Sequence, residues 1–171
     1  HPTSDQPVAQ TQSETSGLSV FSEMPDRLKI DKIGVNAQIV SVGLADDGAM
    51  DAPSNLADVG WYNQSSKAGE SNYAILLDGH HGVGIERGVF ERLGEVAEGD
   101  QIVLTSDKGT KLTYKVREVE MKPYRDVDMN RALNTYEPNL QSLTIITCEG
   151  LYSQAEATYD QRTVVYAERI K

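Results

Sequence analysis

The sequence predicts a mostly-β domain, a barrel or a sandwich, with only two short helices. Apolar runs along the chain are short and strand-sized, turn residues separate them, and several runs alternate apolar and polar residues with a period of two. No internal repeat is visible. A chain of 171 residues fits one domain and is long enough to form a hydrophobic core without disulfides or metals.

Residues 1–24 are expected to form a disordered linker or stalk, and residues 25–171 the folded domain. The first stretch is rich in Ser, Thr, Gln and Pro and has almost no large apolar side chains. The chain begins at His1 rather than Met, so we expect a processed or truncated piece. A signal peptide or membrane anchor would then lie upstream, and the linker would tether the domain to it.

The first half of the domain contains three local signals. Residues 28–40, LKIDKIGVNAQIV, alternate with a slip at Asp31-Lys32, which predicts a bend or bulge inside one long strand. Asp47-Gly48 predicts a hairpin turn. The continuous run YAILLDG at 73–79 is typical of a strand buried on both faces.

The second half contains both predicted helices and four more strands. Val89, Phe90 and Leu93 have helical spacing, which predicts a helix over 88–96, and a second helix is expected over 130–138. EGD at 98–100 turns into the strand QIVLTS, and TKLTYKV follows as an alternating strand. SLTIITC (142–148) and RTVVYAERI (162–170) are the last two predicted strands.

Charge and hydropathy exclude several classes of function. The net charge of −10 argues against nucleic-acid binding, which depends on Lys and Arg neutralising phosphates, and against direct binding to an anionic membrane. No apolar stretch approaches the roughly 18 residues that a membrane span needs.

Cys148 is the only cysteine, so the chain forms neither an internal disulfide nor a cysteine-based zinc site. A free cysteine is most often a small buried hydrophobe. Cys148, however, ends an apolar strand and precedes a polar loop, a position that favours a reactive thiol.

A nucleophilic thiol needs a proton-transfer partner, and the pair His80-His81 directly follows the run at 73–79. Adjacent residues on a strand face opposite sides, so at most one of the two meets Cys148. The alternatives are a solvated turn histidine or half of a metal site. Since no third ligand is evident, we expect neither a metal nor another cofactor.

Arg162 begins the last predicted strand. If that strand pairs antiparallel with SLTIITC, Arg162 lies beside Cys148 and supplies a guanidinium for a developing oxyanion. Taken alone, an arginine at the start of a strand is most often a surface charge.

TIITC at 144–148 resembles the TLxTC signature of the sortase family, with Ile145 where that family usually has Leu. The segments KIGVNAQIV, VGWY, LLDGHHGVGIERGVFERL, EGD and YDQRTVVYAERI follow in sortase order. The resemblance covers roughly residues 25–171 and implies a closed eight-stranded sortase β-barrel. The VGWY and GVF segments favour class E or F.

The resemblance also implies the roles of individual residues. It makes Cys148 the nucleophile, His80 the acid/base, since the Gly-His order favours it over His81, and Arg162 the anion-stabilising group. Thr147 matches a position associated with substrate binding and oxyanion support. Glu149 follows the nucleophile, and like-charge repulsion with the thiolate predicts slow reaction or a site for a cationic group.

The implied activity is that of an exported cysteine transpeptidase on the extracellular face of a Gram-positive-type cell membrane. It would cleave an LPxTG-like C-terminal sorting signal of surface or pilin proteins between Thr and Gly. It would then transfer the acyl group to an amine of a peptidoglycan precursor or a pilin lysine. Two alternatives stay open: a non-catalytic β-barrel binding module in which Cys148 is filler, and a cysteine peptidase that only hydrolyses.

Overall fold

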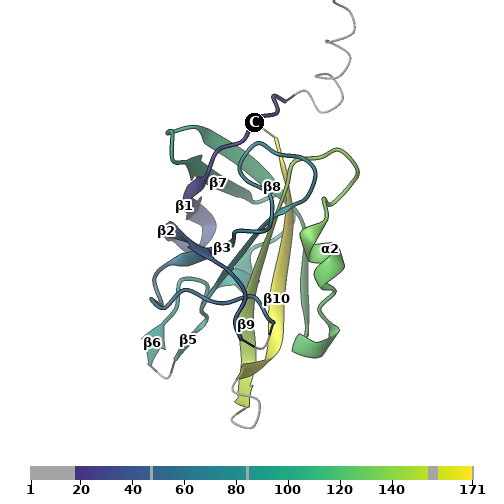
Figure 1. Cartoon of the computed structure of the whole chain (residues 1–171). Coiled ribbons are helices and arrows are strands. Elements are labelled where there is room, and N and C mark those ends of the chain that lie inside the picture. The colour runs from purple at the N-terminus through teal and green to yellow at the C-terminus, as the bar shows by residue number, and fades with distance from the viewer. Residues whose placement is uncertain (1–17, 47, 84, 154–157, 171) are drawn as a thin grey trace, which may run out of the picture.

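The computed structural model describes residues 18–170 except 47, 84 and 154–157, with the backbone alone for 83, 148–153 and 158–160. Among these residues, eight strands close into a barrel in the order β1-β2-β3-β4-β9-β10-β8-β7 (Figure 1). The barrel strands are β1 (Pro25–Ile30), β2 (Val35–Val42), β3 (Val59–Tyr62), β4 (Ile75–Gly79), β7 (Gln101–Ser106), β8 (Lys111–Pro123), β9 (Ser142–Ser153) and β10 (Thr158–Arg169). The predicted closed eight-stranded barrel is confirmed.

The remaining elements are short. A separate two-stranded hairpin consists of β5 (Gly82–Val83) and β6 (Glu86–Arg87). The helices are η1 (Asp31–Ile33), η2 (Leu93–Glu95) and η3 (Tyr124–Asp126), which are 3₁₀ turns, and α2 (Met129–Leu133). In Figure 1, α2 lies outside the barrel wall. No helix among the described residues is both long and apolar enough to cross a bilayer.

Two barrel contacts are parallel, β2 with β3 and β4 with β9, and the other neighbouring strands pair antiparallel. Antiparallel neighbours can be joined by tight turns, whereas parallel ones need longer connections. The connection from β4 to β9 contains β5 to β8 and α2, so β4 pairs with a strand that is distant in the sequence.

Strand β4 is buried on both faces, as its continuous apolar run predicts. Ile75 and Leu77 point into the barrel core, whereas Leu76 belongs to a second apolar cluster on the outside of the wall. This outer cluster consists of Leu76, Ala132, Ile146, Val164 and Tyr166, with Met50, Tyr62, Val127, Leu133 and Tyr136 packed against it. The face that carries it is called the outer face below.

The segment 28–40 is two strands and not one bent strand. The 3₁₀ turn η1 and Gly34, which adopts the left-handed conformation at φ 71°, reverse the chain between β1 and β2, and Ile30 pairs with Val35. The slip in alternation at Asp31-Lys32 therefore marks the turn of a hairpin. The separately predicted turn at Asp47-Gly48 falls partly outside the described residues, but Gly48 has φ 86° and donates to the carbonyl of Ala45.

The predicted helix over 88–96 is wrong except at its end, where η2 forms. Gly88, Val89 and Phe90 donate their backbone N–H groups to the carbonyls of His81, Leu56 and His80. These bonds to other segments replace the i to i−4 bonds of a helix, so the spacing of Val89, Phe90 and Leu93 reflects packing into the barrel core.

The second predicted helix, 130–138, is only partly correct because α2 covers five residues. The Asp128 carboxylate caps it by accepting from the N–H of Arg131, at 3.1 Å. The chain becomes extended at Asn134, and the N–H of Tyr136 donates to the Ser142 hydroxyl at 2.9 Å. That bond directs the chain toward β9 and ends the helix early.

Residues 18–24 run along the barrel before β1. The Ser19 carbonyl accepts hydrogen bonds from Gln141 at 2.7 Å and from Arg169 at 3.2 Å, and Glu23 forms a β-bridge with Ala68. The rest of the predicted linker, residues 1–17, lies outside the described residues. The boundary at residue 24 stays a prediction.

Candidate active site

The strand register brings His80, Cys148 and Arg162 together. Cys148 in β9 pairs directly with Arg162 in β10. On its other side, β9 pairs parallel with β4 up to the pair Gly79–Thr147, and His80 is the next residue after Gly79. Because neighbouring strands lie about 4.8 Å apart, the three backbones form one row across three strands. This row of His80, Cys148 and Arg162 is called the first row below.

His80 is held by its side chain and its backbone. Its half-buried imidazole places Nε2 2.6 Å from the carbonyl oxygen of Pro53. A carbonyl oxygen only accepts, so Nε2 carries a proton in this contact, which fixes the ring orientation. The carbonyl of His80 also accepts from the N–H of Phe90 at 3.0 Å.

The tight turn after β4 depends on Gly88. Its N–H donates to the carbonyl of His81 at 3.0 Å, and a Cβ atom at this position would collide with the backbone of His80 and His81. The segment GVF, at 88–90, therefore clamps the two histidines to the barrel. The sequence pattern predicts a helix for these residues and misses this role, because nothing local links Gly88 to the two histidines.

Arg162 lies half-buried at the other end of the first row. Its guanidinium carbon is 5.5 Å from the centre of the Tyr124 ring, and Nη1 donates a long 3.4 Å bond to the carbonyl of Gln161. Stacking on an aromatic face holds the planar guanidinium while leaving its charge undiminished. An arginine held in this way supplies fixed N–H donors beside Cys148.

The Thr147 side chain is not on the face of the sheet that carries His80 and Arg162. Its side chain is 2% exposed, and its hydroxyl donates to the carbonyl of Gly79 at 2.9 Å. This bond ties β9 to the end of β4, immediately before Cys148 and His80. The hydroxyl thus positions the two strands from inside the barrel wall.

The side chains of Cys148 and Glu149 lie outside the described residues, although both backbones belong to β9. The expected effect of Glu149 on the thiol therefore stays a prediction. Within the described part of the chain, no group of three His, Cys, Asp or Glu side chains converges to hold a metal ion.

Asp78 is a further polar residue at this site, and sequence reasoning overlooked it. It belongs to β4 two residues before His80 and, by strand alternation, lies on the outer face with Leu76. Its Oδ1 is buried and has no hydrogen-bond partner among the described residues. Burial, with a smaller contribution from the nearby charge of Asp51, raises the pKa of Asp78 to about 8. In the sequence, a carboxyl group within the otherwise apolar run LLDG is the feature that indicates an unusual environment for Asp78.

The apolar outer cluster adjoins the first row, and an ion-pair network fastens α2 over it. Arg131 of α2 binds Glu118 and Glu120 of β8, with Nη2 2.6 Å from Oε1 of Glu118. Its guanidinium carbon also lies 4.1 Å from the centre of the Tyr166 ring. The outer cluster therefore lies beside the first row and is covered by α2, which these ion pairs attach to β8.

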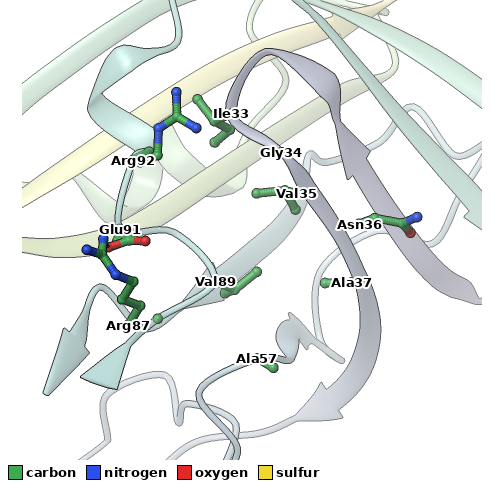
Figure 2. Close-up of a pocket in the computed structure, with 11 residues that line it drawn as sticks. Ile33, Gly34, Val35, Asn36, Ala37, Ala57, Arg87, Val89, Glu91 and Arg92 are labelled. Carbon is green, nitrogen blue, oxygen red and sulfur yellow. Dashed lines mark hydrogen bonds and ion pairs between the residues drawn. The ribbon is translucent and has the colours of Figure 1, made fainter. Parts of the chain in front are cut away.

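A pocket of 280 Å³ lies on the far side of the segment 88–90 that clamps the two histidines (Figure 2). It is lined by Ile33, Gly34, Val35, Asn36, Ala37, Ala57, Arg87, Gly88, Val89, Glu91 and Arg92. Its arginines are engaged, Arg87 with Glu91 at 2.7 Å and Arg92 with Glu95 at 2.9 Å. The pocket includes no residue of the first row, and its charges are locally balanced.

A family model described as Sortase domain matches residues 28–170. Solved structures with similar folds include a lid mutant of sortase A from Corynebacterium diphtheriae, with 20% identity and a TM-score of 0.66 over 100% of this chain and 83% of that one. Sortase C-1 from Actinomyces oris has 22% identity and a TM-score of 0.66, covering 99% and 83%. A sortase D5 transpeptidase from Clostridium perfringens has 22% identity and a TM-score of 0.61, covering 99% and 90%. No curated protein matches the chain.

Proposed function

Because the chain belongs to the sortase family of cysteine transpeptidases, we propose that it cleaves an LPxTG-like sorting signal between Thr and Gly and passes the acyl group to an amine. The observation that carries this proposal is the register of β4, β9 and β10, which aligns His80, Cys148 and Arg162. Sortases act at the cell surface of Gram-positive bacteria. We infer the same location for this chain, on the extracellular face of the membrane, with the linker as its tether.

The reaction has two steps. The Cys148 thiolate attacks the Thr carbonyl, and the guanidinium of Arg162 stabilises the negative charge on the tetrahedral oxyanion. The C–N bond to Gly then breaks, and His80 gives its proton to the departing amine, leaving a thioester on Cys148. In the second step an amine attacks the thioester and loses a proton to His80, and the C–S bond breaks to release the Cys148 thiolate, which restores the starting state of both residues.

Thr147 and the clamp around His80 support these steps by position. The bond from the Thr147 hydroxyl to Gly79 holds the strand end that carries His80 against the strand that carries Cys148. The bond from His80 to the Pro53 carbonyl orients the ring before substrate binds. The acceptor is an amine of a peptidoglycan precursor or a pilin lysine.

The test is to incubate the protein with a panel of LPxTG-variant peptides, with and without candidate amines, and to identify the products by mass spectrometry. We expect a cleaved peptide that is ligated when an amine is present, and no turnover by Cys148→Ala. Turnover by that variant would eliminate the proposed nucleophile. Cleavage without ligation to any amine would favour a hydrolytic cysteine peptidase, and no cleavage a binding module.

The two histidines provide a matched pair of variants. His80→Ala should be inactive, whereas His81→Ala should retain substantial activity, because only His80 directly follows the last registered pair of β4 and β9. The reverse result would move the acid/base role to His81. Circular dichroism of both variants is the control for folding.

A further inference from the structure

A second row of residues lies beside the first row on the outer face. Gly60 of β3 pairs with Asp78, Asp78 pairs with Ile146, and Ile146 pairs with Val164 of β10. Asp78 precedes His80 by two positions, so the rows are about 7 Å apart. Ile146 and Val164 of the second row belong to the outer cluster, so the second row joins that cluster to the first row.

Asp78 is the only polar side chain among these four residues, and it packs closely against its neighbours. A Cβ atom at Gly60 would collide with Oδ1 of Asp78 and would lie 3.0 Å from Cδ of Pro53. Oδ1 is therefore enclosed, whereas the residue as a whole stays partly exposed. An enclosed oxygen without a donor is a poor site for negative charge, which favours the neutral acid with its proton on Oδ2.

The nearby charge of Asp51 adds to this preference. Asp51, from the segment before β3, contributes a negative charge, and His80, the residue after the end of β4, has its Nε2 bound to the Pro53 carbonyl. β3 contributes Gly60 and β9 contributes Ile146. At neutral pH, the Asp78 carboxyl group is consequently a neutral O–H donor between Gly60 and Ile146.

We propose that Asp78 is a specificity-determining residue that donates a hydrogen bond to a backbone carbonyl of the sorting signal, about two residues before the cleaved bond. This rests on the proposed function. An extended peptide advances about 3.3 Å per residue, so the spacing of the two rows corresponds to two residues. The apolar residues beyond Asp78 are buried beneath α2, so the upstream part of the peptide is placed at the edge of this covered cluster, beside Asp78.

The test compares Asp78→Asn with Asp78→Leu on one cleavable peptide. Asn keeps an N–H donor and does not titrate, whereas Leu keeps the volume and has no donor. At pH 7 we expect kcat/KM of Asp78→Asn to stay within about threefold of wild type. Asp78→Leu should lose about tenfold, mainly through KM, because the bond forms in the ground state as well as the transition state.

The pH profile distinguishes substrate binding from a merely structural role. The ratio of wild-type to Asp78→Asn kcat/KM at each pH removes the pH dependence that the two proteins have in common. Since the pKa of Asp78 is about 8, the ratio should be constant below pH 7 and fall about tenfold by about pH 9.5 as the donor is lost. A constant ratio, or equal losses in the Asn and Leu variants at pH 7, would overturn the inference and leave the proposed function standing. A wild-type protein inactive on every peptide would overturn both.

Discussion

Replacing Asp78 by Asn should remove a large pH dependence from the stability of the barrel. The folded protein keeps the Asp78 proton up to a pKa of about 8, whereas the unfolded chain releases it near 3.8. Between these values the folded state binds more protons, so the free energy of unfolding falls as the pH rises. Each pH unit corresponds to about 1.4 kcal/mol, and the loss between pH 3.8 and 7 is therefore about 4 kcal/mol.

Urea unfolding of wild type and Asp78→Asn, at unit steps from about pH 5 to 9 under reducing conditions, measures this effect. The difference in the free energy of unfolding should move in favour of the Asn variant by about 1.4 kcal/mol per pH unit and become constant above about pH 8. Groups common to both proteins cancel in the difference. Parallel curves for the two proteins would refute the reasoning, because they would mean that Asp78 is ionised in the folded state.

Four further substitutions follow from the structure. Tyr114→Phe removes a hydroxyl that is buried in the barrel without a hydrogen-bond partner among the described residues, and should raise the free energy of unfolding by about 1 kcal/mol in urea titrations. Arg131→Met should lower it by about 1 kcal/mol, since this side chain is 38% exposed and its ion pairs with the two β8 glutamates are screened; an unchanged midpoint would show that α2 is held by packing alone. Thr147→Val breaks the bond to the Gly79 carbonyl and should lower kcat while changing the free energy of unfolding little; a kcat equal to that of wild type would limit the hydroxyl to a structural role. Arg162→Lys should lower kcat and kcat/KM together by about a hundredfold, or ~3 kcal/mol, with KM little changed in steady-state kinetics, and near-wild-type values would remove Arg162 from the site.

The strands were predictable because their apolar patterns are local. The run at 73–79 indicates burial on both faces, and the pairing of Arg162 with Cys148 follows from placing two adjacent strands antiparallel. The residues at 88–90 have an apolar spacing that suits a helix, but their N–H groups bond to distant carbonyls, and a local pattern contains no information about those partners.

The polar features of the site were harder to predict for the same reason. The bond between His80 and the Pro53 carbonyl joins positions 27 residues apart, and neither residue type indicates the other. Asp78 is conspicuous only once Gly60 is known to lie against it, because that contact encloses its oxygen. A carboxyl group in an apolar run signals an unusual environment, but the register of β3 and β4 determines which environment it is.

The parallel contact between β4 and β9 also bears on the order in which the first row forms during synthesis. Gly79 and Thr147 are 68 positions apart, and Arg162 is in the last strand of the barrel. Contacts so distant in sequence form late and slowly, since a long loop must close first. A growing chain that has reached only residue 147 holds His80 but neither its thiol nor its guanidinium partner. The three residues of the first row therefore come together only after β10 has been made.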